Sequence, residues 1–161
     1  MLNLNTSSEK VAGLYVAFFD RRPDADGLEF WVNKFEEGAG AQEAADQFFD
    51  SDEAKERLPS PDDDPETTIT TLFNNLFERE PDDEGREFWI EQLQDGTSVG
   101  ELVTQLLFGA QGEDAERINN EVESNLSEVE DDNDDNDDDA DDADDADEDD
   151  DADEDDDADE D

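Results

Sequence analysis

The 161-residue sequence contains no cysteine and no histidine. The absence of cysteine excludes disulfide bonds and thiol nucleophiles, and the absence of histidine excludes the Ser–His and Cys–His dyads of hydrolases. Together the two absences also exclude an ordinary zinc site. Composition alone therefore removes the most familiar nucleophilic and zinc-dependent enzyme classes.

Basic residues are scarce, because nine lysines and arginines stand against 57 acidic residues, for a formal net charge of −48. Negative charge in this excess repels nucleic-acid phosphate and anionic membrane surfaces, so we expect no nucleic-acid partner. No apolar run approaches the ~20 residues that span a bilayer, so we expect no membrane insertion. The first ten residues have neither a basic nor an apolar segment, so we expect no cleavable signal peptide.

Acidic residues concentrate at the C-terminal end, where residues 128–161 hold 26 of the 57 acids and no base. This segment has almost no apolar surface to offset the entropy of ordering, so we expect a disordered acidic tail. Charges this dense collect counterions, so we expect weak, non-stoichiometric binding of divalent cations such as calcium, and no other cofactor. The residues expected to contribute are Asp131, Asp132, Asp134, Asp135, Asp137, Asp138 and Asp139.

The rest of the chain contains an internal repeat, in which residues 14–31 align without a gap on residues 72–89, at an offset of 58. Repeats at such a period indicate two copies of one structural unit. We therefore expect repeat 1 over residues 6–58, a Pro/Asp-rich linker over 59–65 and repeat 2 over 66–127. Identical pairs include Leu14/Leu72, Arg21/Arg79, Pro23/Pro81, Asp24/Asp82, Gly27/Gly85 and Trp31/Trp89.

Each repeat is predicted to form about four helices, because its apolar residues recur at intervals of three and four. Thr6 with Glu9 forms a capping box, Asp64-Pro65 is a typical helix start, and Gly38 and Gly96 stand where left-handed C-cap glycines belong. The fourth helices are expected over Ser51–Leu58 and Glu113–Val129. Strand and hairpin patterns are absent. The predicted fold class is all-α, with both repeats packed as one small helical domain because each has too little apolar face alone.

The pattern Leu-Tyr-x3-Phe-x-Arg-x-Pro-Asp-x2-Gly-x3-Trp occupies Leu14–Trp31 and, with Phe73 in place of the tyrosine, Leu72–Trp89. It resembles the bacterial domain of unknown function 4214 in two tandem copies, and it is distantly similar to the phycobilisome linker domain. The resemblance implies an all-helical module of secreted and surface-associated bacterial proteins, often found beside calcium-binding repeats or adhesive domains. It implies binding or assembly rather than catalysis, and it carries over no catalytic residue.

Two acidic turns, one in each repeat, are candidate calcium-binding sites. The candidate ligands are Asp24 and Asp26 in repeat 1 and Asp82 and Glu84 in repeat 2, each set followed by a glycine. In an EF-hand register the first ligand position of repeat 1 is Arg22, so the match to a calcium loop is loose. We favour Asp24 and Asp82 as helix N-caps, with the neighbouring acids stabilised by the helix dipole.

Aromatic pairs and arginines recur at matching positions of the repeats. Phe30/Trp31 and Phe88/Trp89 are either an aromatic binding platform or core residues, and the helical spacing favours the core. Arg21 and Arg79 either clamp a carboxylate ligand or pair with a nearby Asp at a helix start, and we favour the pairing.

Nothing in the sequence singles out two of the 57 acids as a catalytic acid/base pair, so we expect no catalytic residue and no enzymatic activity. The favoured function is a secreted or surface-associated interaction or assembly module, binding a protein partner or itself. Its export would use a route that leaves the N-terminus intact. The alternative is a cytoplasmic protein of a salt-adapted organism, whose acidity serves solubility.

Overall fold

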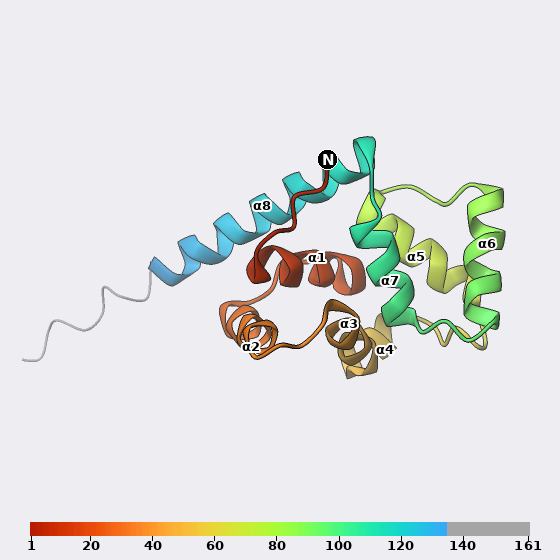
Figure 1. Ribbon diagram of the computed structural model, residues 1–161, viewed down its shortest axis with the longest axis horizontal. Coiled ribbons are helices and arrows are strands. Elements are labelled where there is room, and N and C mark those ends of the chain that lie inside the picture. Colours follow the sequence, from red (N-terminus) through yellow and green to blue (C-terminus); the bar gives the residue numbers. More distant parts are fainter. Residues whose placement is uncertain (135–161) are drawn as a thin grey trace, which may run out of the picture.

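The computed structural model describes residues 1–134, and within them the chain forms helices and no strand, which confirms the all-α prediction. From residue 135 on, the expected disordered tail lies outside the described residues. Four helices belong to each repeat, as predicted. They are α1 (Ser7–Phe19), α2 (Ala25–Glu36), α3 (Ala41–Asp50), α4 (Asp52–Arg57), α5 (Pro65–Phe77), α6 (Asp83–Gln94), α7 (Val99–Phe108) and α8 (Gly112–Asp134) (Figure 1).

The helix starts follow local capping chemistry. The Thr6 hydroxyl accepts a hydrogen bond from the Glu9 backbone N–H at 3.2 Å, and the Glu9 carboxylate accepts one from the Thr6 N–H at 2.8 Å. This reciprocal pair satisfies two N–H groups that the first turn of α1 leaves unpaired. At α5 the Asp64 carboxylate accepts from the Thr67 N–H, and Pro65 occupies the first turn. Both predicted caps are confirmed.

Helices α1 and α5 each end at a non-glycine residue in the left-handed conformation, which the sequence did not indicate. Asp20 and Glu78, which are equivalent positions of the two repeats, adopt left-handed backbone conformations with φ of 49° and 48°. Non-glycine residues rarely adopt this conformation, because Cβ crowds the backbone. Gly38 and Gly96, by contrast, have φ of 107° and 102° as predicted, directly beyond α2 and α6.

The contacts between equivalent helices and residues indicate an approximate twofold relation between the two repeats. Helix α1 packs on its counterpart α5, and α3 packs on its counterpart α7. The Asn75 side-chain amide donates to the Ala17 carbonyl at 2.9 Å, although Asn75 and Ala17 occupy the same position of their repeats. A contact between equivalent positions is the property of an isologous interface, so this pair lies close to the axis.

One continuous core joins the repeats, which confirms that they pack as one helical domain. Residues of α1, α3 and α4 mix in it with residues of α5, α7 and α8. The largest fully buried side chains include Phe18, Leu14, Ile69, Leu72, Leu102 and Leu107.

Helices α3 and α7 cross at very close range. A Cβ atom added to Gly100 of α7 would lie 2.6 Å from the Asp46 backbone nitrogen of α3, closer than real Cβ contacts occur. Beside it the Ser98 hydroxyl donates to Asp46 Oδ1 at 2.9 Å. The crossing therefore depends on glycine at position 100.

Helices α2 and α6 lie at the outer ends of the domain, and neither contains a fully buried residue. The apolar sides of these helices, which include Trp31 and Phe35 of α2 and Trp89 of α6, pack against the core but remain partly exposed. The reason is position, because α2 contacts α1 and α8, and α6 contacts α5 and α7, while the other sides of both helices are exposed.

Two boundaries predicted near the C-terminal end are wrong. Helix α8 was expected to end at Val129 but continues to Asp134, and the tail expected from residue 128 therefore begins inside this helix. Val122 and Val129 are buried, and α8 packs along α1 and α2 of the other repeat. This packing stabilises a helix over residues whose composition argues for disorder. An ion pair between Arg22 and Glu128, at 3.7 Å, adds a further link.

The N-terminal segment also lies against α8. The Asn3 backbone N–H donates to the Asn119 side-chain oxygen, and the Asn119 amide donates to the Met1 carbonyl, both at 2.8 Å. Leu4 is buried in the core. Repeat 1 was predicted to start at residue 6. The residues before it extend the repeat and join the N-terminal segment to α8, the last helix of repeat 2.

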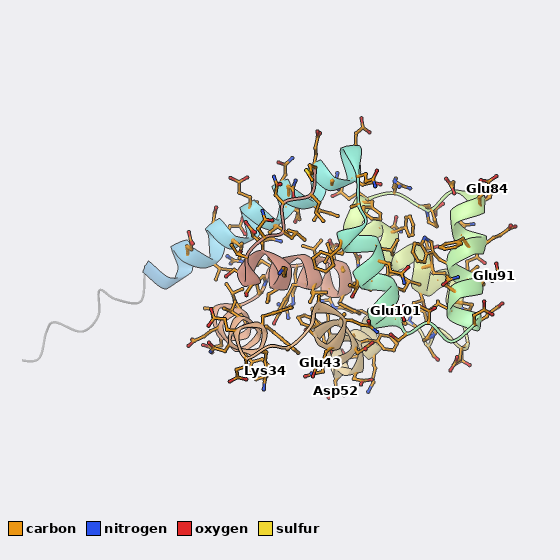
Figure 2. The ribbon with its side chains drawn as sticks, viewed as in Figure 1. Lys34, Glu43, Asp52, Glu84, Glu91 and Glu101 are labelled. Atoms are coloured by element: carbon orange, nitrogen blue, oxygen red, sulfur yellow. The ribbon has the colours of Figure 1, made fainter. Side chains whose placement is uncertain are left out.

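Charged side chains lie on the outside. Among residues 1–130 the buried polar side chains are Thr68 and Asn125, neither of them charged. Figure 2 shows how the acidic side chains project from the surface, with Glu84 and Glu91 on α6. None of the helices within residues 1–134 has the length and apolar composition needed to cross a membrane.

Candidate functional site

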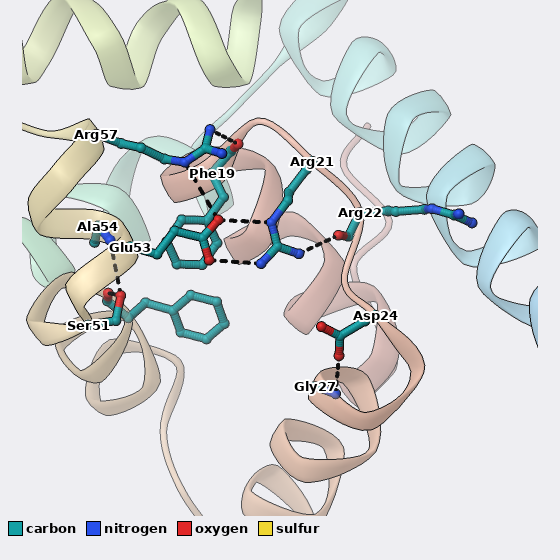
Figure 3. Close-up of polar contacts among 10 residues, drawn as sticks. Phe19, Arg21, Arg22, Asp24, Gly27, Ser51, Glu53, Ala54 and Arg57 are labelled. Atoms are coloured by element: carbon teal, nitrogen blue, oxygen red, sulfur yellow. Dashed lines mark hydrogen bonds and ion pairs between the residues drawn. The ribbon is translucent and has the colours of Figure 1, made fainter.

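Arg21 forms a bidentate clamp inside repeat 1 (Figure 3). Its Nε and Nη2 donate to the two carboxylate oxygens of Glu53 at 2.9 and 2.8 Å, and its Nη1 donates to the Arg22 carbonyl at 2.9 Å. Arg57 donates to the Phe19 carbonyl at 2.9 Å. These bonds tie the end of α1 to both ends of α4.

Repeat 2 contains the equivalent clamp. Arg79 Nε and Nη2 donate to the Asp114 carboxylate at 3.2 and 2.7 Å, and Asp114 lies in the first turn of α8. The interpretation that both arginines form structural ion pairs is confirmed, but the predicted partner, a nearby Asp at a helix start, is wrong. The partners lie in the first turns of helices 32 and 35 residues away, and one of them is a glutamate. Each guanidinium also lies over two aromatic rings of its own repeat, 5.1 to 5.5 Å from the ring centroids.

The clamps shift the ionisation of their members. The hydrogen bonds from Arg21 lower the pKa of Glu53, and the same bonds raise the pKa of Arg21. Hydrogen bonding to Asp114 likewise raises the pKa of Arg79. Burial raises the pKa of Tyr15, whose ring lies beneath Arg21. The arginines are therefore held as structural cations.

The lowered pKa of Glu53 predicts a pH-dependent contribution to stability. A depressed carboxyl pKa means that the clamp stabilises the fold at neutral pH and is lost as the pH falls through that pKa. Both side chains are about one-third exposed, so solvent screening limits the clamp to about 1 kcal/mol. We expect Glu53→Gln to lower the melting temperature at pH 7 and to leave a much smaller difference at pH 3.

The matched control for this measurement is Glu56→Gln, which removes an exposed carboxylate from the same helix. Comparing melting curves of the three proteins at both pH values separates the clamp from the general relief of acidic repulsion. A difference between the native protein and Glu53→Gln that does not change with pH would contradict the assignment.

The acidic turns act as helix caps. Asp24 Oδ1 accepts from the Gly27 N–H at 2.6 Å, and Asp82 Oδ1 accepts from the Gly85 N–H at 2.7 Å. Asp26 and Glu84 lie in the first turns of α2 and α6 with exposed side chains. Among residues 1–130, whose side chains the structure describes, no three acidic side chains gather closely enough to hold a metal ion. Calcium binding at these turns stays a prediction.

The tail residues expected to collect cations divide into two groups. Asp131, Asp132 and Asp134 belong to the last turn of α8. The others lie outside the described residues, namely Asp135, Asp137, Asp138 and Asp139. Their diffuse cation binding also stays a prediction.

The structure separates each aromatic pair into an inner and an outer residue. Trp31 packs on Phe48 of the core with ring centroids 4.6 Å apart. Phe30 and Phe88, however, are 51% and 49% exposed, and no other phenylalanine in residues 1–130 is among the exposed large hydrophobic residues. The core interpretation therefore holds for the tryptophans and is wrong for the phenylalanines.

A signal for these exposed phenylalanines was present in the helical register. In α2 the core-facing residues follow the spacing i, i+3, i+4 and i+7 from Leu28, and Phe30 falls outside that series. Because successive helical residues are rotated by about 100°, a phenylalanine directly before an inward tryptophan must lie to one side. The same reasoning applies to Phe88 beside Trp89.

Two outward surfaces result, one at each end of the domain. We define the α2 face and the α6 face by the exposed side chains of these helices, which surround Phe30 and Phe88 with acids. The α2 face comprises Asp26, Glu29, Phe30, Asn33 and Glu36, and the α6 face comprises Asp83, Glu84, Glu87, Phe88, Glu91 and Gln94.

Two overlapping segments of the chain, residues 3–58 and 45–108, match a family model described as Domain of unknown function (DUF4214). Together they span residues 3–108, more than half of the chain, and two matches agree with tandem copies. No curated protein and no solved structure matches the chain. The distant similarity to the phycobilisome linker domain stays a prediction.

Proposed function

Because the chain belongs to the DUF4214 family, whose description assigns no activity, we propose its function from its own geometry: a non-enzymatic interaction module with two binding ends. The observation that carries the proposal is the half-exposed phenylalanine at the same position of both repeats. The helices that carry these two residues, α2 and α6, lie on opposite sides of the domain (Figure 1).

The energetics of the two phenylalanines favour a role in binding. Covering the exposed half of a phenylalanine side chain contributes about 1 kcal/mol, and aromatic residues are enriched in the buried centres of interfaces. Packing within the domain explains the tryptophan of each pair but gives no reason for an exposed phenylalanine beside it. A surface that partners cover gives such a reason.

In this proposal the protein acts at the cell surface or outside the cell, as the bacterial family context implies. The acids of residues 128–161 contribute diffuse, weak attraction for divalent cations and for basic partners. Binding through two ends suits assembly, because one domain can then connect two partner molecules.

Photo-crosslinking of the full chain in the cells that produce it tests the proposal. Benzoylphenylalanine replaces Phe30 or Phe88 one at a time, and the control replaces Gln105, an exposed residue of α7. We expect the same crosslinked species from positions 30 and 88 and none from position 105. Equal crosslinking at all three positions, or none at positions 30 and 88, would contradict the proposal.

A further inference from the structure

The two faces differ in one respect that points to the chemistry of a partner. In repeat 1 the Lys34 ammonium lies 5.6 Å from the centroid of the Phe30 ring and 3.8 Å from a carboxylate oxygen of Glu37. The equivalent positions of repeat 2 are Gln92 and Asp95. Repeat 1 therefore supplies a cation to its own phenylalanine, and repeat 2 keeps the acid but replaces the cation by a neutral amide.

Cations over aromatic rings recur in this domain. Arg21 lies over Tyr15 and Phe19, and Arg79 lies over Phe73 and Phe77. The negative face of an aromatic ring attracts a cation, and the attraction increases as water is removed. Lys34 over Phe30 is thus one case of a contact that this chain uses in both repeats.

The charges of the α6 face favour a cation from another molecule. Three exposed glutamates lie near Phe88 on this helix. They are Glu84, four residues before it, Glu87, directly before it, and Glu91, three residues after it. The one base of α6, Arg86, is 26% exposed and is paired with Glu66 and Glu80 at 3.4 and 3.8 Å. The exposed side chains of the α6 face therefore include an aromatic ring and carboxylates but no base.

We propose that the α6 face binds a lysine or arginine side chain of a basic partner segment, with the cation over Phe88 as Lys34 lies over Phe30. The inference rests on the proposed interaction function and names the chemistry of the partner at one end. A second copy of this chain is disfavoured as the partner, because its net charge of −48 repels the face. Nucleic acid and anionic lipid are disfavoured for the same reason.

Proton NMR of the full chain with a blocked tetra-arginine peptide tests the proposal. Each face has its own reporter, because the Trp89 ring lies 4.9 Å from Phe88 and the Trp31 ring lies 5.2 Å from Phe30, between centroids. At 0.15 M salt we expect the Trp89 indole N–H to titrate with an affinity about twofold to fivefold higher than Trp31. The acids at the described end of α8 lie on the α2 side of the domain, where Glu128 pairs with Arg22 and α8 contacts α2. Their attraction favours Trp31, so a preference for Trp89 does not come from them, and the ratio of the two affinities is the measurement.

Three variants complete the test. Gln92→Lys introduces the lysine of repeat 1 into repeat 2, and we expect it to remove the preference of the peptide for Trp89. Gln94→Lys is the matched control, because it adds the same charge to the same helix without placing it at the fourth residue after Phe88. Phe88→Ala should weaken the Trp89 titration by about twofold to fivefold. Melting curves verify that each variant is folded.

Equal titration of Trp31 and Trp89 in the native chain would overturn the proposal, and so would equal effects of Gln92→Lys and Gln94→Lys. Either result would mean that diffuse charge attraction alone holds the peptide. Failure here is distinguishable from failure of the interaction function, since crosslinks at positions 30 and 88 can still form with a partner that is not cationic.

Discussion

Neither repeat is expected to fold when it is produced without the other. Chains comprising residues 1–60 and residues 61–161 should each lack a cooperative melting transition, although the whole chain has one. Separation removes the packing of α1 on α5 and of α3 on α7. It also removes α8 and its buried Val122 and Val129 from α1. Each half then exposes apolar surface that isolated short helices cannot offset.

Circular dichroism and calorimetry of the two halves check this expectation. Mixing them in equal amounts provides the control, because restoration of helical signal and of a melting transition would show that the segments are intact and lack only each other. A cooperative transition in either half alone, as a monomer, would show that the single core is not required. We expect each separate half to lose the cooperative melting transition entirely.

Gly100→Ala is expected to destabilise the domain by about 1–3 kcal/mol, the typical cost of overpacking a close contact. The added methyl group would meet the Asp46 side chain and its backbone nitrogen, and the backbone of α3 cannot move aside as a flexible side chain can. The alteration must therefore push α3 and α7 apart where they cross. Alanine favours helix over glycine by up to ~1 kcal/mol in a helix interior, and this opposing gain is smaller at Gly100 because it is the second residue of α7.

Gly13→Ala is the matched control, because it makes the same change inside α1. There the new methyl group would meet the ends of the Leu4 and Leu107 side chains at 3.1 to 3.2 Å, and these ends can shift. We expect its free energy of unfolding to stay within about 1 kcal/mol of the native value. Urea denaturation at one salt concentration measures both variants. A Gly100→Ala protein as stable as the native chain would refute the close-crossing account.

Local chemistry explains why the element boundaries were predictable from residue order. Thr6 with Glu9, Asp64 with Pro65, and Asp24 and Asp82 all act within four residues of their own positions. The internal repeat and the tandem match also depend on residue order alone. The sequence predicted that the two arginines form ion pairs, but it did not predict their partners. Glu53 lies 32 residues from Arg21, and Asp114 lies 35 residues from Arg79.

The remaining features depend on contacts between residues far apart in the chain. Helix α8 reaches Val129 on the surface of repeat 1, which buries Val122 and Val129, whereas its acidic residues argue for disorder. Asn75 meets Ala17, and Gly100 meets Asp46, only because the twofold arrangement brings equivalent helices together. Phe30 and Phe88 are surface residues because α2 and α6 are covered on one side only. Helical periodicity indicates which side of a helix is apolar, but the neighbouring helices determine how much of that side is covered.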